Sequence, residues 1–329
     1  MSPKDFLRLS AYLQMMPVLE AGEEVLVGGQ AVFEGVMMRA PHSYCVAVRK
    51  PDGSLATEEK PIQRVSEKYP IFKYPVLRGL GTLGQAMTLG TSALRFSANA
   101  SLDEGEANRK EGEKPPEITP TMMAGTLIFN LVVFIFMYKF VPLFLATQLG
   151  KVVPAVSGRF ATNMVDGLIR LMILLGFMFG LSLLKDIRRV FEFHGAEHKV
   201  VFNFESGKPV NVENAQKFVT FHPRCGTNFM FVIMAIAIIM YALVPIDGFW
   251  MKFFVRIALL PLILGLSYEV IRFAARKQGS FFGMLAVPGL WLQRITTKPP
   301  DDGQTEVAIH ALNGAMALEA KQGGELVIA

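Results

Sequence analysis

The sequence predicts a mainly α-helical, multi-pass membrane protein with about four transmembrane helices and a small cytoplasmic β-rich domain ahead of them. Apolar residues make up 51% of the 329 positions and charged residues only 19%, and the mean hydropathy is +0.36. Several apolar stretches approach the roughly 20 residues that a helix needs to cross a bilayer. This composition excludes a disordered chain, and a total of two cysteines excludes a disulfide-stapled fold.

The β-rich domain is expected at residues 25–62. Residues 44–48 are apolar and strand-forming, and residues 55–58 can return as the partner strand. Pro51 and Gly53 lie between these two stretches, and both residue types are typical of a tight turn because Pro fixes φ and Gly accepts a positive φ. The sequence therefore predicts at least one antiparallel pair of strands here.

Three further segments flank this domain and lead to the membrane region. Residues 1–24 form an N-terminal segment without the pattern of a cleavable signal peptide. Residues 63–100 are expected to be amphipathic helices that lie on the membrane surface or dock under the helical bundle. Residues 101–120 are polar and contain Pro, which is typical of a linker.

The transmembrane bundle is expected at residues 121–297. Gly176 and Gly180 have the G-x-x-x-G spacing that lets a second helix approach closely, so a homo-oligomer is a plausible assembly. The apolar stretch 281–292 is too short, and too rich in Gly and Pro, to be a span. The four candidate spans are residues 122–149, 168–184, 229–244 and 253–268.

Basic residues indicate how the spans are oriented. They are concentrated in the segment 185–228 between the second and third spans, and again after the fourth span from Arg272 to Lys298. By the positive-inside rule, the middle segment, both termini and the C-terminal tail 298–329 face the cytoplasm. Because these residues flank apolar segments and the net charge is only +5, membrane lipid is the expected partner and nucleic acid is not.

A candidate metal site lies in the middle segment. His194 and His198 are four residues apart, so on a helix both imidazoles project from one face and can bind one ion. Glu197 completes an H-x-x-E-H pattern, which is that of inverted zinc proteases, in which the Glu is the general base on a water that the metal activates. The alternative is an ion-pair cluster at a helix end, with Glu197 paired to a neighbouring Arg or Lys.

Such a site needs a further ligand, and the sequence offers two main candidates, His222 and Glu269. Glu269 stands near the end of the fourth span, where an ionisable side chain is costly and therefore a functional candidate, although an ion pair with Arg272 would also account for it. Cys225 is either a thiolate ligand beside His222 or an inert buried thiol. Arg224 is either a bidentate contact for a carboxylate or phosphate or a charge that sets topology.

Four runs of sequence together resemble the YqhQ-like family of bacterial integral membrane proteins. They are GGQAVFEGVMMRAP at 28–41, HGAEHK at 194–199, HPRCGTNF at 222–229 and PGLWLQRITTKPPDDGQTEVAIHAL at 288–312. The resemblance covers about residues 25–312 and implies an inner-membrane protein suspected of binding metal, with no known substrate. The motif positions that it implies are His194, Glu197, His198, His222, Arg224 and Cys225.

The expected function is metal-dependent hydrolysis of a peptide or lipid-linked substrate at the cytoplasmic membrane face. Zinc suits imidazole-rich ligation best, whereas iron or manganese would suit a site with an added carboxylate. The rival interpretation is a membrane scaffold or assembly factor in which the cluster is structural, because a closed four-ligand site that includes Cys225 leaves no open coordination position. A transporter is a weaker alternative, since four spans without an internal repeat are few for alternating access.

Overall fold

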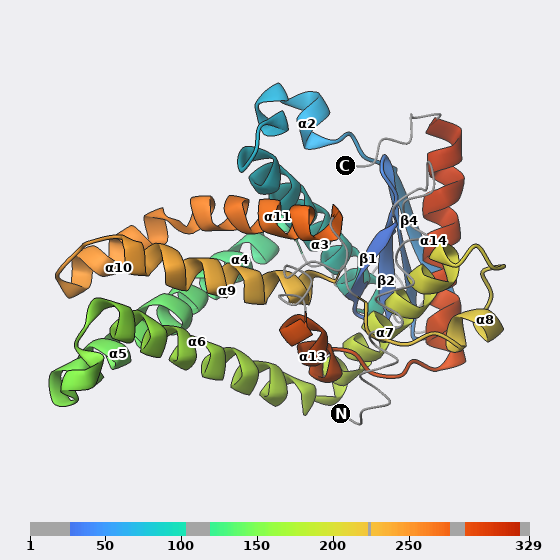
Figure 1. The fold of residues 1–329 in the computed structure, drawn as a ribbon. Helices are drawn as coiled ribbons and strands as arrows, with labels where there is room; N and C mark the ends of the chain where they lie inside the picture. Colours follow the sequence, from blue (N-terminus) through green and yellow to red (C-terminus); the bar gives the residue numbers. More distant parts are fainter. Residues whose placement is uncertain (1–26, 103–118, 223–224, 277–286, 323–329) are drawn as a thin grey trace.

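The structure, a computed structural model, describes residues 27–102, 119–222, 225–276 and 287–322 (Figure 1). The N-terminal segment 1–24 and most of the expected linker lie outside the described residues. A bundle of long helices occupies one side of the molecule in Figure 1, and a β-sheet covered by helices occupies the other. The predicted combination of a mainly helical chain with an N-terminal β-rich part is therefore confirmed.

The sheet has four antiparallel strands in the order of the sequence, each paired with the next. The strands are β1 (Gly28–Val32), β2 (Gly35–Arg39), β3 (Ser43–Arg49) and β4 (Leu55–Pro61). The predicted turn lies between β3 and β4, where Gly53 has a φ of 85°. The backbone N–H of Ser54 donates to Asp52 Oδ1 at 2.8 Å, which closes this turn.

Both faces of the sheet are covered, as the alternation of side chains along β3 shows. Tyr44, Val46 and Val48 pack against Ala93 and neighbouring residues of α3 (Leu77–Leu102). Cys45 and Ala47 point to the opposite face and join the core formed by α7 (Lys185–Glu205) and α14 (Asp302–Gln322). The C-terminal tail is thus a packed helix, and α7 is fixed against the sheet.

Helix α3 connects the sheet to the helical bundle. It follows the short helix α2 (Val65–Lys68) and the 3-10 turn η2 (Pro70–Lys73). Its C-terminal half packs on the sheet, and its start contacts α11 (Leu260–Arg276). At Gly79 a Cβ would lie 2.6 Å from Cβ of Tyr268, so only glycine permits this approach. The expected amphipathic segment therefore docks on both parts of the protein.

Two helices among the described residues are long and apolar enough to cross a membrane. The first covers Thr121–Val152 and consists of α4 (Pro120–Ile135), the π-helical turn η4 (Phe136–Phe140) and α5 (Val141–Val152). The second, α6 (Arg159–Ser182), starts nine positions before the expected span at residue 168, so it includes Asp166 as well as Arg170. These helices suggest a membrane location.

The expected third and fourth spans have a less regular form. Helices α10 (Phe249–Ala258) and α11 pass the criteria for a span only as a pair, which bends by 49°. Helix α9 (Gly226–Leu243) contributes the apolar part Phe229–Leu243, which belongs to the shorter class of apolar helices. The described residues thus contain two candidate spans, or three if the bent pair forms a single span, whereas about four were expected.

Candidate metal centre

Helix α7 carries the H-x-x-E-H motif and is held by its apolar face. Phe193, Ala196 and Val200 are buried in the core that α7 shares with the sheet and α14. The same helical turn presents His194 and His198 side by side, with their ring centroids 4.4 Å apart. The predicted helical spacing of these two residues is therefore realised in the structure.

Gly195 explains how other parts of the chain come close to these rings. A Cβ at this position would collide with the backbone oxygen of Lys298 and lie 3.2 Å from Thr220 Cγ2. The N–H of Lys298 also donates to the oxygen of Phe191 at 2.9 Å, which ties the segment after α13 (Val287–Thr296) to α7. The loop at Thr220, which follows α8 (Val212–Gln216), also packs against α7 at Gly195.

Both imidazoles are oriented by backbone carbonyls of these two segments. His194 Nδ1 lies 2.8 Å from the oxygen of Thr296, and His198 Nδ1 lies 2.5 Å from the oxygen of Thr220. A carbonyl oxygen can only accept, so in each ring Nδ1 carries the hydrogen and Nε2 keeps its lone pair. Burial lowers the pKa of His198, which favours the neutral imidazole that a metal ligand must be.

Cys225 brings a third donor atom to the same place. It is the N-cap residue of α9, and its Sγ lies 3.3 Å from His194 Nε2. One ligand atom from each of His194, His198 and Cys225 lies within 4.8 Å of the others. Thr227 Oγ1 is 3.4 Å from Sγ and can donate to it. Two imidazole nitrogens and a thiolate form a donor set that zinc uses in proteins, so these residues fit a metal ion.

Glu197 lies beside this group. Its Oε2 is 3.4 Å from His198 Nε2, and its side chain is only 7% exposed. The space for it is provided by β1, because a Cβ on Gly29 would lie 2.6 Å from Glu197 Cγ. The glycine-rich run at 28–41 and the histidine motif, distant in sequence, therefore meet at the carboxylate of Glu197.

His222 is close to the group but is not one of its three members. Its ring centroid lies 5.5 Å from that of His198 and 4.5 Å from that of Phe202. Its Nε2 is 3.5 Å from Glu205 Oε2 at the end of α7. Gln293 of α13 fixes its backbone, accepting from the His222 N–H and donating to the His222 oxygen, each at 2.8 Å.

Glu269, the other expected third ligand, is placed elsewhere. Its carboxylate forms a two-point ion pair with Arg78 of α3 and accepts from the backbone N–H of Val76 at 3.2 Å. The described His-His-Cys group therefore does not include it. The ionisable residue near the end of α11 has a structural partner instead: Arg78 on a different helix is bonded to it, and the expected Arg272 adds a weaker electrostatic interaction.

The remaining charged residues of the sequence motifs divide into those with structural partners and one that is not described. Glu34 has a φ of 51° in the β1–β2 turn and pairs with Arg189 of α7 at 2.5 and 2.6 Å. Arg39 donates to Gln85 Oε1 at 3.0 Å. Arg224 lies outside the described residues, so the role expected for it stays a prediction.

The carbonyls of Thr220 and Thr296 could not be found from the sequence. Any residue type offers a backbone oxygen, so no side-chain pattern marks these positions. Gly29 and Gly195 carry a weak signal, because each is a glycine inside a strand or helix, where it costs stability unless a close approach requires it. Gly29 and Gly195 were therefore the signals in the sequence that another part of the chain approaches closely at these positions.

The fold and site together define a class: a mainly helical protein with candidate membrane spans, a four-stranded sheet and a His-His-Cys group that could bind metal. The chain belongs to the YqhQ-like family, described as "Protein of unknown function (DUF1385)", whose match covers residues 74–318. It is 37% identical to "Uncharacterized protein YqhQ" of Bacillus subtilis strain 168 over 298 residues, which is 89% of this chain and 93% of the relative. No solved structure matches it.

Proposed function

We propose that this protein is a metal-dependent hydrolase that acts at the cytoplasmic face of the membrane. His194, His198 and Cys225 would hold the ion, and Glu197 would be the general base. The observation that carries the proposal is the pair of Nδ1 contacts to Thr296 and Thr220, which leaves the Nε2 lone pair of each imidazole for an ion. Outer contacts of this kind are typical of metal-ligating histidines.

Three protein ligands favour a reactive ion over a structural one. Structural zinc has four protein ligands, whereas catalytic zinc keeps one position open for water or substrate. When bound, zinc would supply Lewis-acid activation of water in this position. Glu197 is not one of the three grouped ligand residues, but its Oε2 lies 3.4 Å from His198 Nε2. A general base is expected at such a position, beside the ion and not bound to it.

The chain's own residues then have separable tasks in hydrolysis. Glu197 accepts the proton of the attacking water as the new bond to the carbonyl or phosphoryl centre forms. It returns that proton to the leaving group as the scissile bond breaks, so charge and atoms balance. The β1 backbone at Gly29 and the buried setting keep the carboxylate in one position. A peptide or a lipid-linked ester at the membrane surface is the proposed substrate class.

The cytoplasmic orientation and the four-span topology are part of the same proposal. The metal centre lies on α7 and at the start of α9, next to the basic residues of the segment 185–228. The positive-inside rule places such a segment in the cytoplasm of a bacterium, where thiols stay reduced. A second copy that packs on Gly176 and Gly180 stays a prediction; nothing described in this chain lies within 4 Å of a Cβ at either glycine.

Replacement of Glu197 by glutamine tests the proposal. The purified zinc-loaded protein is incubated with lipid and peptide extracts of bacterial membranes, and products that gain one water are followed by mass spectrometry. We expect Glu197→Gln to keep its zinc and to slow product formation by about 10²–10⁴-fold, the usual contribution of a general base. Glu192→Gln, on the same helix and paired with Arg188 at 3.6 Å, is the matched control and should keep full activity.

The same experiment distinguishes the hydrolase from a scaffold with a structural zinc site, an alternative that the thiolate ligand favours. If Glu197→Gln loses zinc, the carboxylate is a fourth ligand, the site is closed, and a scaffold with structural zinc replaces the hydrolase. If Glu197→Gln keeps both zinc and full activity, Glu197 is not the base. Absence of any zinc-dependent product from the wild type also contradicts the proposal.

Gly29 gives an independent prediction about Glu197. Gly29→Ala places a methyl group 2.6 Å from Glu197 Cγ and 2.8 Å from the backbone oxygen of Met37 in β2, so we expect the Glu197 side chain to shift and hydrolysis to fall by at least about tenfold while zinc is retained. Gly28→Ala is a close control, because nothing lies within 4 Å of a Cβ at Gly28. The two rates and zinc contents are measured in parallel; equal rates for both variants would show that β1 does not position Glu197.

A further inference from the structure

A cluster of buried charges lies inside the helical bundle, away from the metal centre. Lys139, Arg170 and Arg256 are each 3–4% exposed, and Asp166 is 1% exposed. They come from three parts of the bundle: the π-helical turn η4, helix α6 and helix α10. Because Lys139 and Arg256 are buried, neither side chain extends to the surface.

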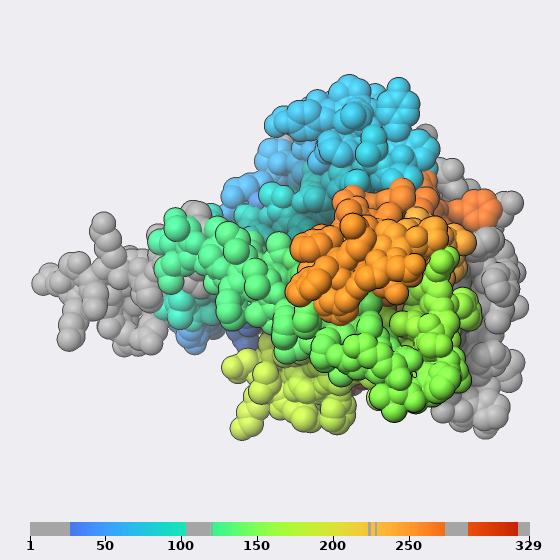
Figure 2. Space-filling model, turned by 90° about the vertical axis from the view of Figure 1, so that its left-hand side faces the viewer, coloured from blue at the N-terminus to red at the C-terminus, as the bar shows by residue number. Residues whose placement is uncertain are grey.

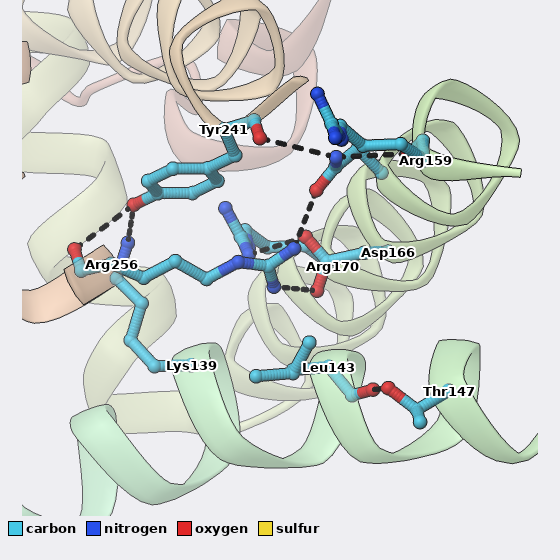
Figure 3. Close-up of polar contacts among 9 residues, drawn as sticks. Lys139, Leu143, Thr147, Arg159, Asp166, Arg170, Tyr241 and Arg256 are labelled. Atoms are coloured by element: carbon cyan, nitrogen blue, oxygen red, sulfur yellow. Dashed lines mark hydrogen bonds and ion pairs between the residues drawn. The ribbon is translucent and has the colours of Figure 1, made fainter. Parts of the chain in front are cut away.

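Asp166 is the centre of this cluster (Figure 3). Its two carboxylate oxygens accept separate hydrogen bonds, from Arg256 at 2.8 Å and from Arg170 at 2.7 Å. Arg256 also donates to Asn163 Oδ1 at 2.6 Å. Because one carboxylate carries one negative charge, it balances only one of these two guanidinium groups.

Tyr241 of α9 contacts the basic side chains of this cluster through its ring and its hydroxyl group. Lys139 Nζ donates to the Tyr241 hydroxyl at 3.1 Å, and that hydroxyl donates to the backbone oxygen of Arg256 at 3.2 Å. The Arg256 and Arg170 guanidinium carbons lie 4.8 and 5.7 Å from the ring centroid. An aromatic face stabilises cations without neutralising them, so the excess of positive charge remains.

The cluster also has donor capacity that its described neighbours do not use. Arg170 Nε is buried without a hydrogen-bond partner among the residues that the structure describes. Uncompensated cations inside a bundle are costly, and such residues are retained where they serve a ligand or a pathway. The two guanidinium groups and one carboxylate alone therefore leave one positive charge without a counter-charge among the described residues of the cluster.

A cavity leads from the surface to this cluster. Its volume is about 280 Å³, and its lining includes Asn163, Tyr241 and Arg256, so it reaches the edge of the cluster at Arg256. Arg159 and Lys252 add two positive charges to the lining, and Asp247 adds one negative charge. Ser157 and Thr162 also line the cavity, but their hydroxyl groups donate to backbone oxygens of the protein itself. Figure 2 views this end of the bundle, where the α10–α11 segment lies beside the α5–α6 segment.

We propose that this cavity binds a phosphate group, carried either by the headgroup of an anionic lipid or by a small soluble ion. The guanidinium and ammonium groups of the lining match phosphate oxygens, and the volume admits a headgroup-sized ligand. The site lies at the end of the bundle opposite α7 (Figure 1), so it is separate from the metal centre. Its positive charge exceeds its negative charge in both the lining and the buried cluster.

The test uses the full chain in a maltoside detergent, which contains no phosphate. In one arm, inorganic phosphate is titrated by calorimetry against chloride at equal ionic strength. In the other arm, phosphatidylglycerol is added and its retention is compared with that of phosphatidylcholine by native mass spectrometry. Binding in the lipid arm alone assigns the headgroup, and binding of inorganic phosphate assigns a soluble ion; either result supports the site.

Variants at the cavity lining keep the test independent of folding. Lys252→Gln lies outside the Asp166 network, and we expect it to weaken binding by about tenfold, the effect of losing one charged hydrogen bond. Lys151→Gln, an exposed residue near the same end that does not line the cavity, is the matched control and should bind as the wild type does. Arg256→Gln should weaken binding further if it folds. Absence of binding in both arms, or equal affinities for wild type and Lys252→Gln, overturns the proposal.

Discussion

Replacement of His198 by alanine is expected to lower the zinc affinity of the purified protein by more than 100-fold. The reason is that His198 is a direct ligand in the proposed site, whereas loss of an outer contact alone usually costs about 10–100-fold. Cys225→Ser should have an effect of the same kind, because a hydroxyl is a far poorer zinc ligand than a thiolate. Affinity is measured by competition with a chromogenic chelator, and bound metal by elemental analysis.

The chain offers a matched control for each of these ligands. His310 is an exposed histidine of α14, and His310→Ala should bind zinc as the wild type does. Cys45 is the other cysteine, and burial in the sheet raises the pKa of its thiol to about 12, so Cys45→Ala should also retain zinc. Equal zinc contents of wild type, His198→Ala and Cys225→Ser would contradict the site.

Gly195→Ala is expected to have the second large effect, on both stability and zinc binding. The added methyl group meets the backbone oxygen of Lys298, and a backbone atom cannot rotate away as a side chain can. We expect a loss of about 1–3 kcal/mol in the free energy of unfolding, as in other overpacked interiors. Displacement of the segments at Thr296 and Thr220 should also weaken zinc binding, because their carbonyls orient the two imidazoles.

Gly84→Ala is the control for this helix substitution. Gly84 lies in α3, and nothing is within 4 Å of a Cβ there, so alanine should be neutral or stabilise the helix by about 0.5–1 kcal/mol. Denaturant unfolding and zinc content are measured for both variants. A Gly195→Ala protein with wild-type stability and zinc affinity would show that the close packing of Lys298 on α7 does not support the site.

The parts of this fold that are local in sequence could be predicted well. The apolar, strand-forming residues 44–48 with the turn at Gly53 indicated strands, and the His194–His198 spacing indicated a shared helix face. Both features depend on residues a few positions apart. The family resemblance based on the four motif runs was also confirmed, because the family match covers residues 74–318 and the relative from Bacillus subtilis is 37% identical over 89% of the chain.

The parts that depend on distant partners could not be predicted. Glu269 was expected to be either a metal ligand or the partner of Arg272, but it pairs with Arg78 from a helix nearly 200 positions earlier. The partner of Arg256 is also distant in the sequence, because Asp166 lies in another helix. Cys225 had two interpretations, a thiolate ligand or an inert buried thiol, and the structure places its Sγ 3.3 Å from His194 Nε2.

The most direct test of the metal centre is X-ray absorption spectroscopy of the zinc-loaded protein at the zinc edge. The account predicts a first shell that contains two nitrogens at about 2.0–2.1 Å and one sulfur at about 2.3 Å, with a light atom in the remaining position. The sulfur contribution should disappear in Cys225→Ser. A wild-type spectrum without any sulfur shell, or one unchanged by that substitution, would contradict a site built from His194, His198 and Cys225.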